Sequence, residues 1–329
     1  MTQMRQDSFG GAQYSRELSQ RVIISPEFEA HLREVEKAQK TGEISLQPPK
    51  IQKIKIENFS FAILRDDLIG IFNGNKARKL QSLLGADLRG ISKIVSFGSS
   101  QSNAMYNESV FARIKGLKFQ FVISHLSENL SARPCGNFAA ALENGMEIFV
   151  AQNRREFALS LCDENTIFIE EGVAQGEAEA GFIAQAKFIE EYARENGREF
   201  DIFLPSGTGT SAAYLAKHSR FRVFTTPCVG DCSYLREQIL ALDPRSGVQI
   251  LPPPRKFHFG KPVRELYEIW QKARAQTGIE FDLIYDPVGL LTLLANREKF
   301  ANEVLYIHQG GILGNISQLQ RYEYKFKRK

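Results

Sequence analysis

Short apolar runs and longer amphipathic stretches alternate along the chain from residue 51 onward. Stretches such as 177–196 and 262–276 place apolar side chains every three or four residues, which is typical of a helix with one buried face. The short runs are typical of buried strands, and they are residues 94–97, 119–123, 147–150, 166–169, 201–204, 222–225, 281–285 and 303–307. Strands that alternate with helices indicate crossover units. We therefore expect an α/β fold with parallel sheets, in which ligands bind beyond the carboxyl ends of strands.

The first 47 residues follow a different pattern. Residues 1–21 are polar and rich in Gly, Gln and Ser, and a helical pattern then begins at Pro26. Pro48 and Pro49 end the segment. Such a segment is either a docking arm or a poorly ordered extension, and the sequence leaves both open.

Composition narrows the class of protein. The 329 residues include 42 basic and 38 acidic residues, and a net charge of +4 disfavours a nucleic-acid binder. A hydrophobic content of 43% is enough for a sizeable core in one large or two modest domains. No apolar run resembles a secretory signal or reaches the length of a membrane span, so we expect a cytoplasmic protein with no membrane partner. The four cysteines form no Cys-x-x-Cys pair, so we expect no metal site.

Four polar segments carry candidate chemistry: residues 73–80 around Lys76, 97–103, 205–211 and 307–311. A lysine in a Gly/Asn turn can present an amine to an aldehyde, and a Gly/Ser/Thr loop before a helix can bind a phosphate. Pyridoxal 5′-phosphate (PLP) carries both groups. Each segment also has a purely structural interpretation: a turn entering a helix at Lys76, helix caps at Ser102 and in 206–211, and a hydrogen-bonding role for His308.

In order and spacing, these segments resemble the 1-aminocyclopropane-1-carboxylate deaminase and D-cysteine desulfhydrase family of PLP enzymes. The resemblance extends from about residue 48 to residue 314. Its most specific parts are residues 74–80 and 101–103, and it is supported by residues 171–172, 206–210, 286–288 and 308–311. It implies two parallel-sheet domains with flanking helices, the tryptophan synthase β-like arrangement (PLP fold type II).

The resemblance also implies roles for single residues. Lys76 would bond to the cofactor aldehyde and move the proton at the substrate α-carbon, and Asn103 would bond the phenolic oxygen. Ser102, with Gln101 beside it, would bind the substrate carboxylate or assist proton transfer. The phosphate would lie on Gly207, Thr208, Gly209 and Thr210.

The implied domain division is a large PLP domain formed by residues 48–80 and 166–329 and a small mobile domain formed by residues 81–165, after the extension of residues 1–47. A homodimer is the usual state of the family, and the implied partner is a small amino-acid substrate.

Two adjacent positions depart from the family, and a third departure is Gln309, where the desulfhydrase branch often has threonine. A tyrosine of the active site and an acidic or hydroxyl neighbour near the cofactor ring are replaced here by Gly289 and Leu290. Our hypothesis is that Gln309 contacts the ring nitrogen instead, and that Tyr285 or Tyr234 replaces the lost phenol.

Three functions follow from these features. The first is a PLP-dependent lyase or deaminase, D-cysteine desulfhydrase-like, that releases ammonia and a keto acid. The second is a PLP-binding protein with little or no lyase activity and a regulatory or scaffold role. The third is a phosphosugar or nucleotide binder that uses the Thr208 loop without PLP.

Overall fold

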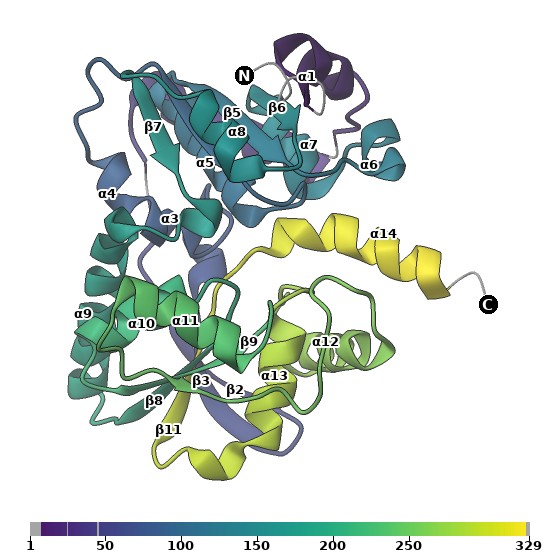
Figure 1. Cartoon of the computed structure of the whole chain (residues 1–329). Coiled ribbons are helices and arrows are strands. Elements are labelled where there is room, and N and C mark those ends of the chain that lie inside the picture. The colour runs from purple at the N-terminus through teal and green to yellow at the C-terminus, as the bar shows by residue number, and fades with distance from the viewer. Residues whose placement is uncertain (1–7, 25, 45, 327–329) are drawn as a thin grey trace.

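The computed structural model describes residues 8–24, 26–44 and 46–326, and within these ranges the strands form two sheets, one above the other in Figure 1. The upper sheet has the order β1 (Phe9–Gly10), β6 (Met146–Val150), β5 (Lys118–Ile123), β4 (Lys93–Phe97), β7 (Thr166–Ile169). The lower sheet has the order β10 (Gln249–Ile250), β9 (Arg222–Pro227), β8 (Phe200–Ser206), β11 (Glu303–His308), β3 (Phe59–Arg65), β2 (Ile51–Ile56). Neighbouring strands are parallel except at β1 and β2, which lie antiparallel at the edges. The predicted fold class is confirmed.

Helices surround each sheet. The upper sheet packs with α1 (Ala12–Ser19), α2 (Pro26–Thr41), α5 (Asn103–Lys115), α6 (Glu128–Ala132), α7 (Gly136–Glu143) and α8 (Arg154–Ser160). The lower sheet packs with α9 (Glu179–Glu195), α10 (Thr210–His218), α11 (Cys232–Leu242), α12 (Arg264–Thr277) and α13 (Asp286–Ala295). Two short helices, α3 (Lys76–Lys79) and α4 (Gln81–Leu84), lie where the chain passes from one sheet to the other.

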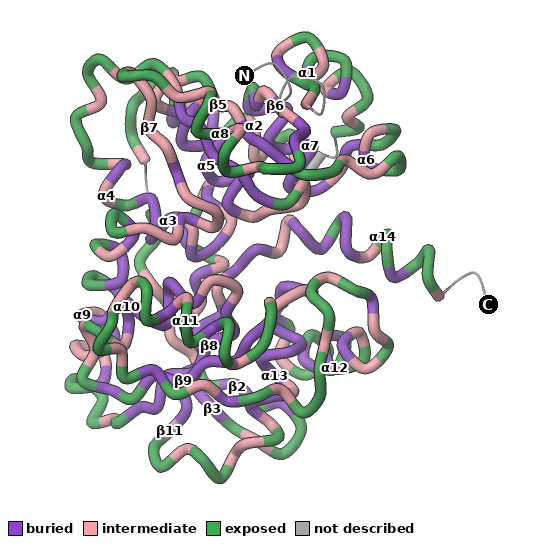
Figure 2. Tube along the Cα trace, viewed as in Figure 1, coloured by how far each residue is buried: buried purple, intermediate pink, exposed green. Residues whose placement is uncertain are grey.

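The central strand β8 illustrates why these residues form a doubly covered sheet. All of its residues are buried, as expected for a parallel strand with helices on both faces. Alternate side chains point to opposite faces. Ile202 and Leu204 join the hydrophobic cluster that contains α9 and α10, whereas Phe203 joins the cluster of α12 and α13. Figure 2 shows the same layering, with buried strands inside and exposed positions on the outer helices.

The last helix, α14 (Asn315–Phe326), runs outward from the junction of the two sheets (Figure 1). It contacts α7 of the upper layer, and its Tyr322 packs in the lower hydrophobic cluster. This helix therefore touches both halves of the molecule. No helix among the described residues combines the length and apolar character that crossing a bilayer requires.

The N-terminal extension docks on the upper sheet. β1 pairs with β6, and α2 packs against α5. Leu18 and Val35 are fully buried in the main hydrophobic cluster. Of the two interpretations left open for residues 1–47, the described part of the segment therefore fits a docking arm. Residues 1–7 lie outside the described residues.

The structure places two sequence features differently. β7 pairs with β4, so the upper sheet extends to Ile169, past the predicted domain boundary at residue 165. The predicted strand at 281–285 is wrong: this segment is a loop that leads into α13. Its backbone N–H groups bond side chains instead of a neighbouring strand, because Leu283 donates to Asn315 Oδ1 at 2.7 Å and Ile284 donates to Asp282 Oδ1 at 2.9 Å.

Candidate active site

The loop before Lys76 is seated directly on the loop that follows β11. The Asn75 N–H donates to the carbonyl oxygen of Gln309 at 2.7 Å. Gly74 has φ +84°, and a β-carbon there would lie 2.0 Å from that same oxygen, so glycine alone allows this approach. The contact brings two of the predicted segments together beyond the carboxyl end of β11, where ligands bind in such sheets.

Lys76 is the first residue of α3, and its half-buried amine donates to Asn75 Oδ1 at 3.1 Å. Burial lowers the pKa of this amine to about 8, against the opposing influence of the carboxyl groups of Glu108 and Asp282. A lysine with this pKa has a substantial neutral fraction near neutral pH, and the neutral amine is the nucleophile. The adjacent Lys79 is buried and donates to the Gly172 carbonyl oxygen at 2.7 Å, which ties α3 to the segment after β7.

A cluster of asparagines fixes the orientation of Asn103. Its Oδ1 accepts from Asn73 Nδ2 at 3.2 Å and from Asn137 Nδ2 at 2.6 Å. Asn107 Oδ1 accepts from the Asn73 backbone N–H at 2.8 Å, which holds the cluster against the Lys76 loop. Since two donors occupy the oxygen of Asn103, its Nδ2 is the atom left to donate to a ligand. Asn137 was not predicted as a site residue, because no motif in the neighbouring sequence indicates such a role.

Ser102 is the N-cap of α5, as its structural interpretation predicted. Its Oγ accepts from the N–H groups of Ala104 and Met105 at 3.1 and 3.3 Å. The cap does not exclude a catalytic role, because the hydroxyl proton remains free to donate. Gln101 Oε1 accepts from Ser317 Oγ at 2.5 Å, which links the start of α5 to α14.

The loop between β8 and α10 has the geometry of an anion site. Its N-cap is Gly209, with φ +74°, and no side chain caps the helix. The alternative of a Ser/Thr cap is therefore not what the chain forms. Thr208 Oγ1 and Thr210 Oγ1 lie 2.8 Å apart, and the uncapped N–H groups at the start of α10 are the donors that an anion needs.

Gln309 bridges the lysine loop and the loop after β8. Its Oε1 accepts from Asn75 Nδ2 at 2.6 Å, and its Nε2 donates to the Pro205 carbonyl oxygen at 2.6 Å. Asn75 Nδ2 also donates to Ser211 Oγ at 3.0 Å. Both ends of the Gln309 amide are thus engaged within the protein.

A cavity of about 560 Å³ lies between these segments. Every site residue predicted from the sequence lines it: Lys76, Gln101, Ser102, Asn103, Gly207, Thr208, Gly209, Thr210 and Gln309. Such a volume is within the usual range for sites that hold a small cofactor and a substrate. The cavity also contains acidic and aromatic residues that the sequence did not assign to it, Asp282 and Phe259 among them.

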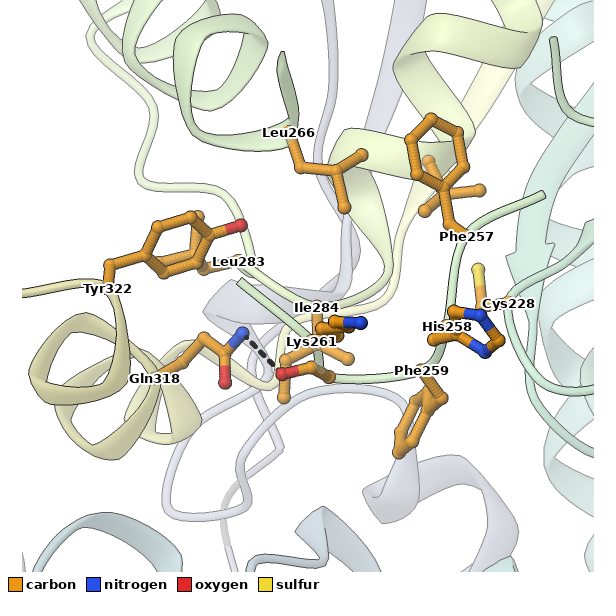
Figure 3. A pocket seen from close by; sticks show the side chains of 12 residues that line it. Cys228, Phe257, His258, Phe259, Lys261, Leu266, Leu283, Ile284, Gln318 and Tyr322 are labelled. Carbon is orange, nitrogen blue, oxygen red and sulfur yellow. Dashed lines mark hydrogen bonds between the residues drawn. The ribbon is translucent and has the colours of Figure 1, made fainter. Parts of the chain in front are cut away.

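Tyr285 and Phe259 form one wall of the cavity. Their ring centroids lie 5.5 Å apart, and a β-carbon on Gly207 would lie 3.4 Å from the Tyr285 hydroxyl oxygen. Burial raises the pKa of Tyr285, so its hydroxyl stays protonated and can donate. Gln318 holds this wall from behind by donating to the Gly260 carbonyl oxygen at 3.0 Å, next to the smaller void shown in Figure 3.

The two adjacent positions that depart from the family, Gly289 and Leu290, lie outside the cavity wall. A β-carbon on Gly289 would lie 2.7 Å from the Tyr306 hydroxyl oxygen and 3.2 Å from Pro205, so this glycine is a packing position. Leu290 is fully buried in the lower hydrophobic cluster. Tyr285 and Tyr234, the two candidates for a replacement phenol, both line the cavity; Tyr234 is exposed, and Tyr285 is partly buried.

Behind the cavity, His308 has the structural role that its simpler interpretation predicted. It is fully buried, with Nδ1 at 2.9 Å from Asp286 Oδ2. Burial alone would lower the pKa of His308, but the charge of Asp286 and that of Asp67 raise it to about 9. Tyr306 donates to the other oxygen of Asp286 at 2.7 Å. The result is a buried charged network directly under the loop of residues 309–311.

No family model matches the chain. A putative 1-aminocyclopropane-1-carboxylate deaminase from Pyrococcus furiosus is 26% identical over 80% of this chain and 88% of its own length. Another protein of that name, from Thermotoga maritima, is 26% identical over 85% of this chain and 98% of its own length. These relatives confirm the resemblance to that family.

Two solved structures share the fold. One, an ACC deaminase homologue, matches with a TM-score of 0.68 and 21% identity, over 92% of this chain and 99% of that one. The other, a pyridoxal 5′-phosphate-dependent aspartate racemase, matches with a TM-score of 0.61 and 12% identity, over 86% of this chain and 92% of that one.

Proposed function

From its relationship to the putative 1-aminocyclopropane-1-carboxylate deaminases, we propose that this chain is a PLP-dependent lyase or deaminase that acts on a small amino acid. The observation that carries the proposal is the cavity itself. It places an amine with a lowered pKa, a free amide donor and an uncapped helix start around one space. These groups match the aldehyde, the phenolic oxygen and the phosphate of PLP, so the residues present fit the cofactor.

The residues that would hold the cofactor come from three segments. The α10 N–H groups and the hydroxyls of Thr208 and Thr210 would bind the phosphate. Asn103 Nδ2 would donate to the phenolic oxygen, and Lys76 would bond the aldehyde carbon. Bound PLP supplies an electron sink for the negative charge left at the substrate α-carbon.

Lys76 would also accept the proton from the substrate α-carbon. The lowered pKa suits a base that works near neutral pH. Ser102, at the helix start, would donate its hydroxyl proton to the substrate carboxylate. Tyr285, protonated and held against Phe259, would donate to the departing group at the β-carbon.

The finer proposal is a D-cysteine desulfhydrase-like α,β-elimination. A thiolate leaves the β-carbon more easily than hydroxide, since its conjugate acid is stronger, so cysteine demands less of the donor than serine does. The products would be sulfide, ammonia and pyruvate. Tyr285 is the one phenol that we assign to the reaction. Its place in the cavity wall favours a lyase over a cofactor-binding protein without turnover.

The test is a visible absorbance spectrum of the purified protein with PLP, recorded for wild type, Lys76→Ala and Lys79→Met. We expect a band from lysine-bound cofactor in wild type and in Lys79→Met, and none in Lys76→Ala. Keto-acid release is then measured with D-cysteine, L-cysteine, serine and β-chloroalanine. A band without keto acid from any of these would favour the cofactor binder, and no band in wild type would remove the PLP assignment.

A further inference from the structure

Asp282 is a buried acid in the cavity wall with one oxygen that has no partner. It is 1% exposed and lies in the loop before α13. Its Oδ1 accepts from the backbone N–H groups of Ile284 and Tyr285. Its Oδ2 is buried and has no hydrogen-bond partner. An unpartnered buried carboxyl oxygen is costly, so a position of this kind needs an explanation.

Other buried acids in the described chain use both of their oxygens. Asp66 is bonded by Arg78 at 2.9 and 2.5 Å, and Asp201 is bonded by Arg222 at 2.9 and 2.5 Å. Glu108 is the exception besides Asp282, because both of its oxygens lack a partner, but it does not line the cavity. Asp282 therefore combines two properties, an unused acceptor and a place in the cofactor cavity.

The unused oxygen lies beside the amide that would hold the phenolic oxygen of PLP. A β-carbon placed on Gly311 would lie 2.4 Å from Asn103 Nδ2 and 3.4 Å from Asp282 Oδ2, so both atoms flank one point next to the Gly311 backbone. In the pyridine ring of PLP, the phenolic carbon and the nitrogen flank a single ring carbon. One ring edge can therefore meet a donor for its oxygen and an acceptor for its N–H at neighbouring positions.

The groups around Asp282 set its protonation state. Burial and the charge of Asp286 raise the pKa of Asp282 to about 7, while the backbone N–H groups of Tyr285 and Ile284 and the charge of His308 act in the opposite direction. The Lys76 ammonium, on the cavity side, also interacts with this carboxyl group. Near neutral pH, the acid therefore has a proton to transfer and becomes more stable as a carboxylate once a cation lies beside it.

We propose, on the basis of the PLP-dependent function above, that Asp282 transfers its proton to the pyridine nitrogen of the bound cofactor and then accepts the resulting N–H as a hydrogen bond. The O–H bond of the acid breaks, the N–H bond forms, and a carboxylate paired with a pyridinium remains. Asp282 thereby takes the role of the acidic or hydroxyl residue that Leu290 replaces. Gln309 is less suited to it, because Asn75 and Pro205 already engage its amide.

The test compares PLP with a deaza analogue in which a C–H group replaces the ring nitrogen. Dissociation constants of both are measured by absorbance titration for wild type, Asp282→Asn and Gln309→Ala. Asp282→Asn is the matched variant, since its Oδ1 can still accept from Ile284 and Tyr285. Thermal unfolding of each cofactor-free variant checks that it folds.

We expect wild type to bind the deaza analogue about tenfold more weakly than PLP, the value of one charge-assisted hydrogen bond. In Asp282→Asn the difference should fall to about threefold, because the neutral amide can still donate to an unprotonated ring nitrogen, and in Gln309→Ala the tenfold difference should persist. Nitrogen NMR of ring-labelled PLP should show a protonated ring nitrogen in wild type and an unprotonated one in Asp282→Asn.

The proposal is overturned if Asp282→Asn keeps the tenfold difference, or if Gln309→Ala alone removes it, which would restore Gln309 as the partner. Either result leaves the PLP-dependent function standing. If wild type binds neither cofactor, the proposed function fails, and the role of Asp282 fails with it.

Discussion

Replacing Gly74 by alanine should separate the lysine loop from the loop that follows β11. Gly74 has φ +84°, and an added β-carbon would lie 2.0 Å from the Gln309 carbonyl oxygen and 2.7 Å from the Gly310 Cα. Both atoms belong to the backbone, so no side-chain rotation can relieve the clash. The loop must move, and the bond from the Asn75 N–H to Gln309 is lost with it.

Gly90 supplies the matched control. It also has φ +84°, but a β-carbon there would meet nothing within 4 Å. Gly90→Ala should therefore show only the cost of a left-handed alanine, about 1–2 kcal/mol. Gly74→Ala should add about 1–3 kcal/mol of steric strain and about 1 kcal/mol for the lost hydrogen bond, a total of about 3–6 kcal/mol.

The assay is urea unfolding of both variants, with PLP affinity measured on the folded proteins. We expect Gly74→Ala to lose at least about 2 kcal/mol more stability than Gly90→Ala and to bind PLP more weakly, because the strained loop carries Lys76. Equal losses of stability in the two variants would refute the inference that close backbone contact at Gly74 positions the lysine.

Three further predictions use other parts of the structure. Ser102→Ala and Ser127→Ala each remove an N-cap, at α5 and α6, and should each cost about 1 kcal/mol in urea unfolding; only Ser102→Ala should also lower keto-acid release, and equal activity in both would remove Ser102 from the mechanism. Burial raises the pKa of Glu108 from its ordinary 4.5 to about 8, so between these pH values the folded state holds a proton that the unfolded state has lost, and stability falls as pH rises. Glu108→Gln should abolish this part of the decline in a pH series of urea unfolding. An unchanged slope in the variant would contradict the assignment to Glu108. Arg78→Met leaves the buried Asp66 without its bidentate partner and should lower the free energy of unfolding in urea by about 3–5 kcal/mol. Adding Asp66→Asn should recover part of that loss, and a double variant no more stable than Arg78→Met would contradict the prediction.

Much of this architecture was predictable because its signals are local. The strands at 94–97 and 201–204 are continuous apolar runs, and the helix at 177–196 has a repeat close to that of an α-helix. The structure places them as β4, β8 and α9 with ends that differ by a few residues. The segment 281–285 has the same apolar character, yet Asn315 and Asp282 bond its backbone N–H groups. Asn315 is distant in the chain, so no local pattern predicts its hydrogen bond with Leu283.

The sequence by itself determined the fold class and the candidates for holding a cofactor, because a phosphate loop and a lysine turn are each made of a few consecutive residues. Only the tertiary structure decided which residues face the cavity. Asn137 reaches Asn103 from another helix, Gln309 meets Gly74 from the end of the chain's last strand, and burial in the folded protein raises the pKa of Asp282. Such properties depend on distances between residues far apart in the chain, and on the water that folding excludes from between them.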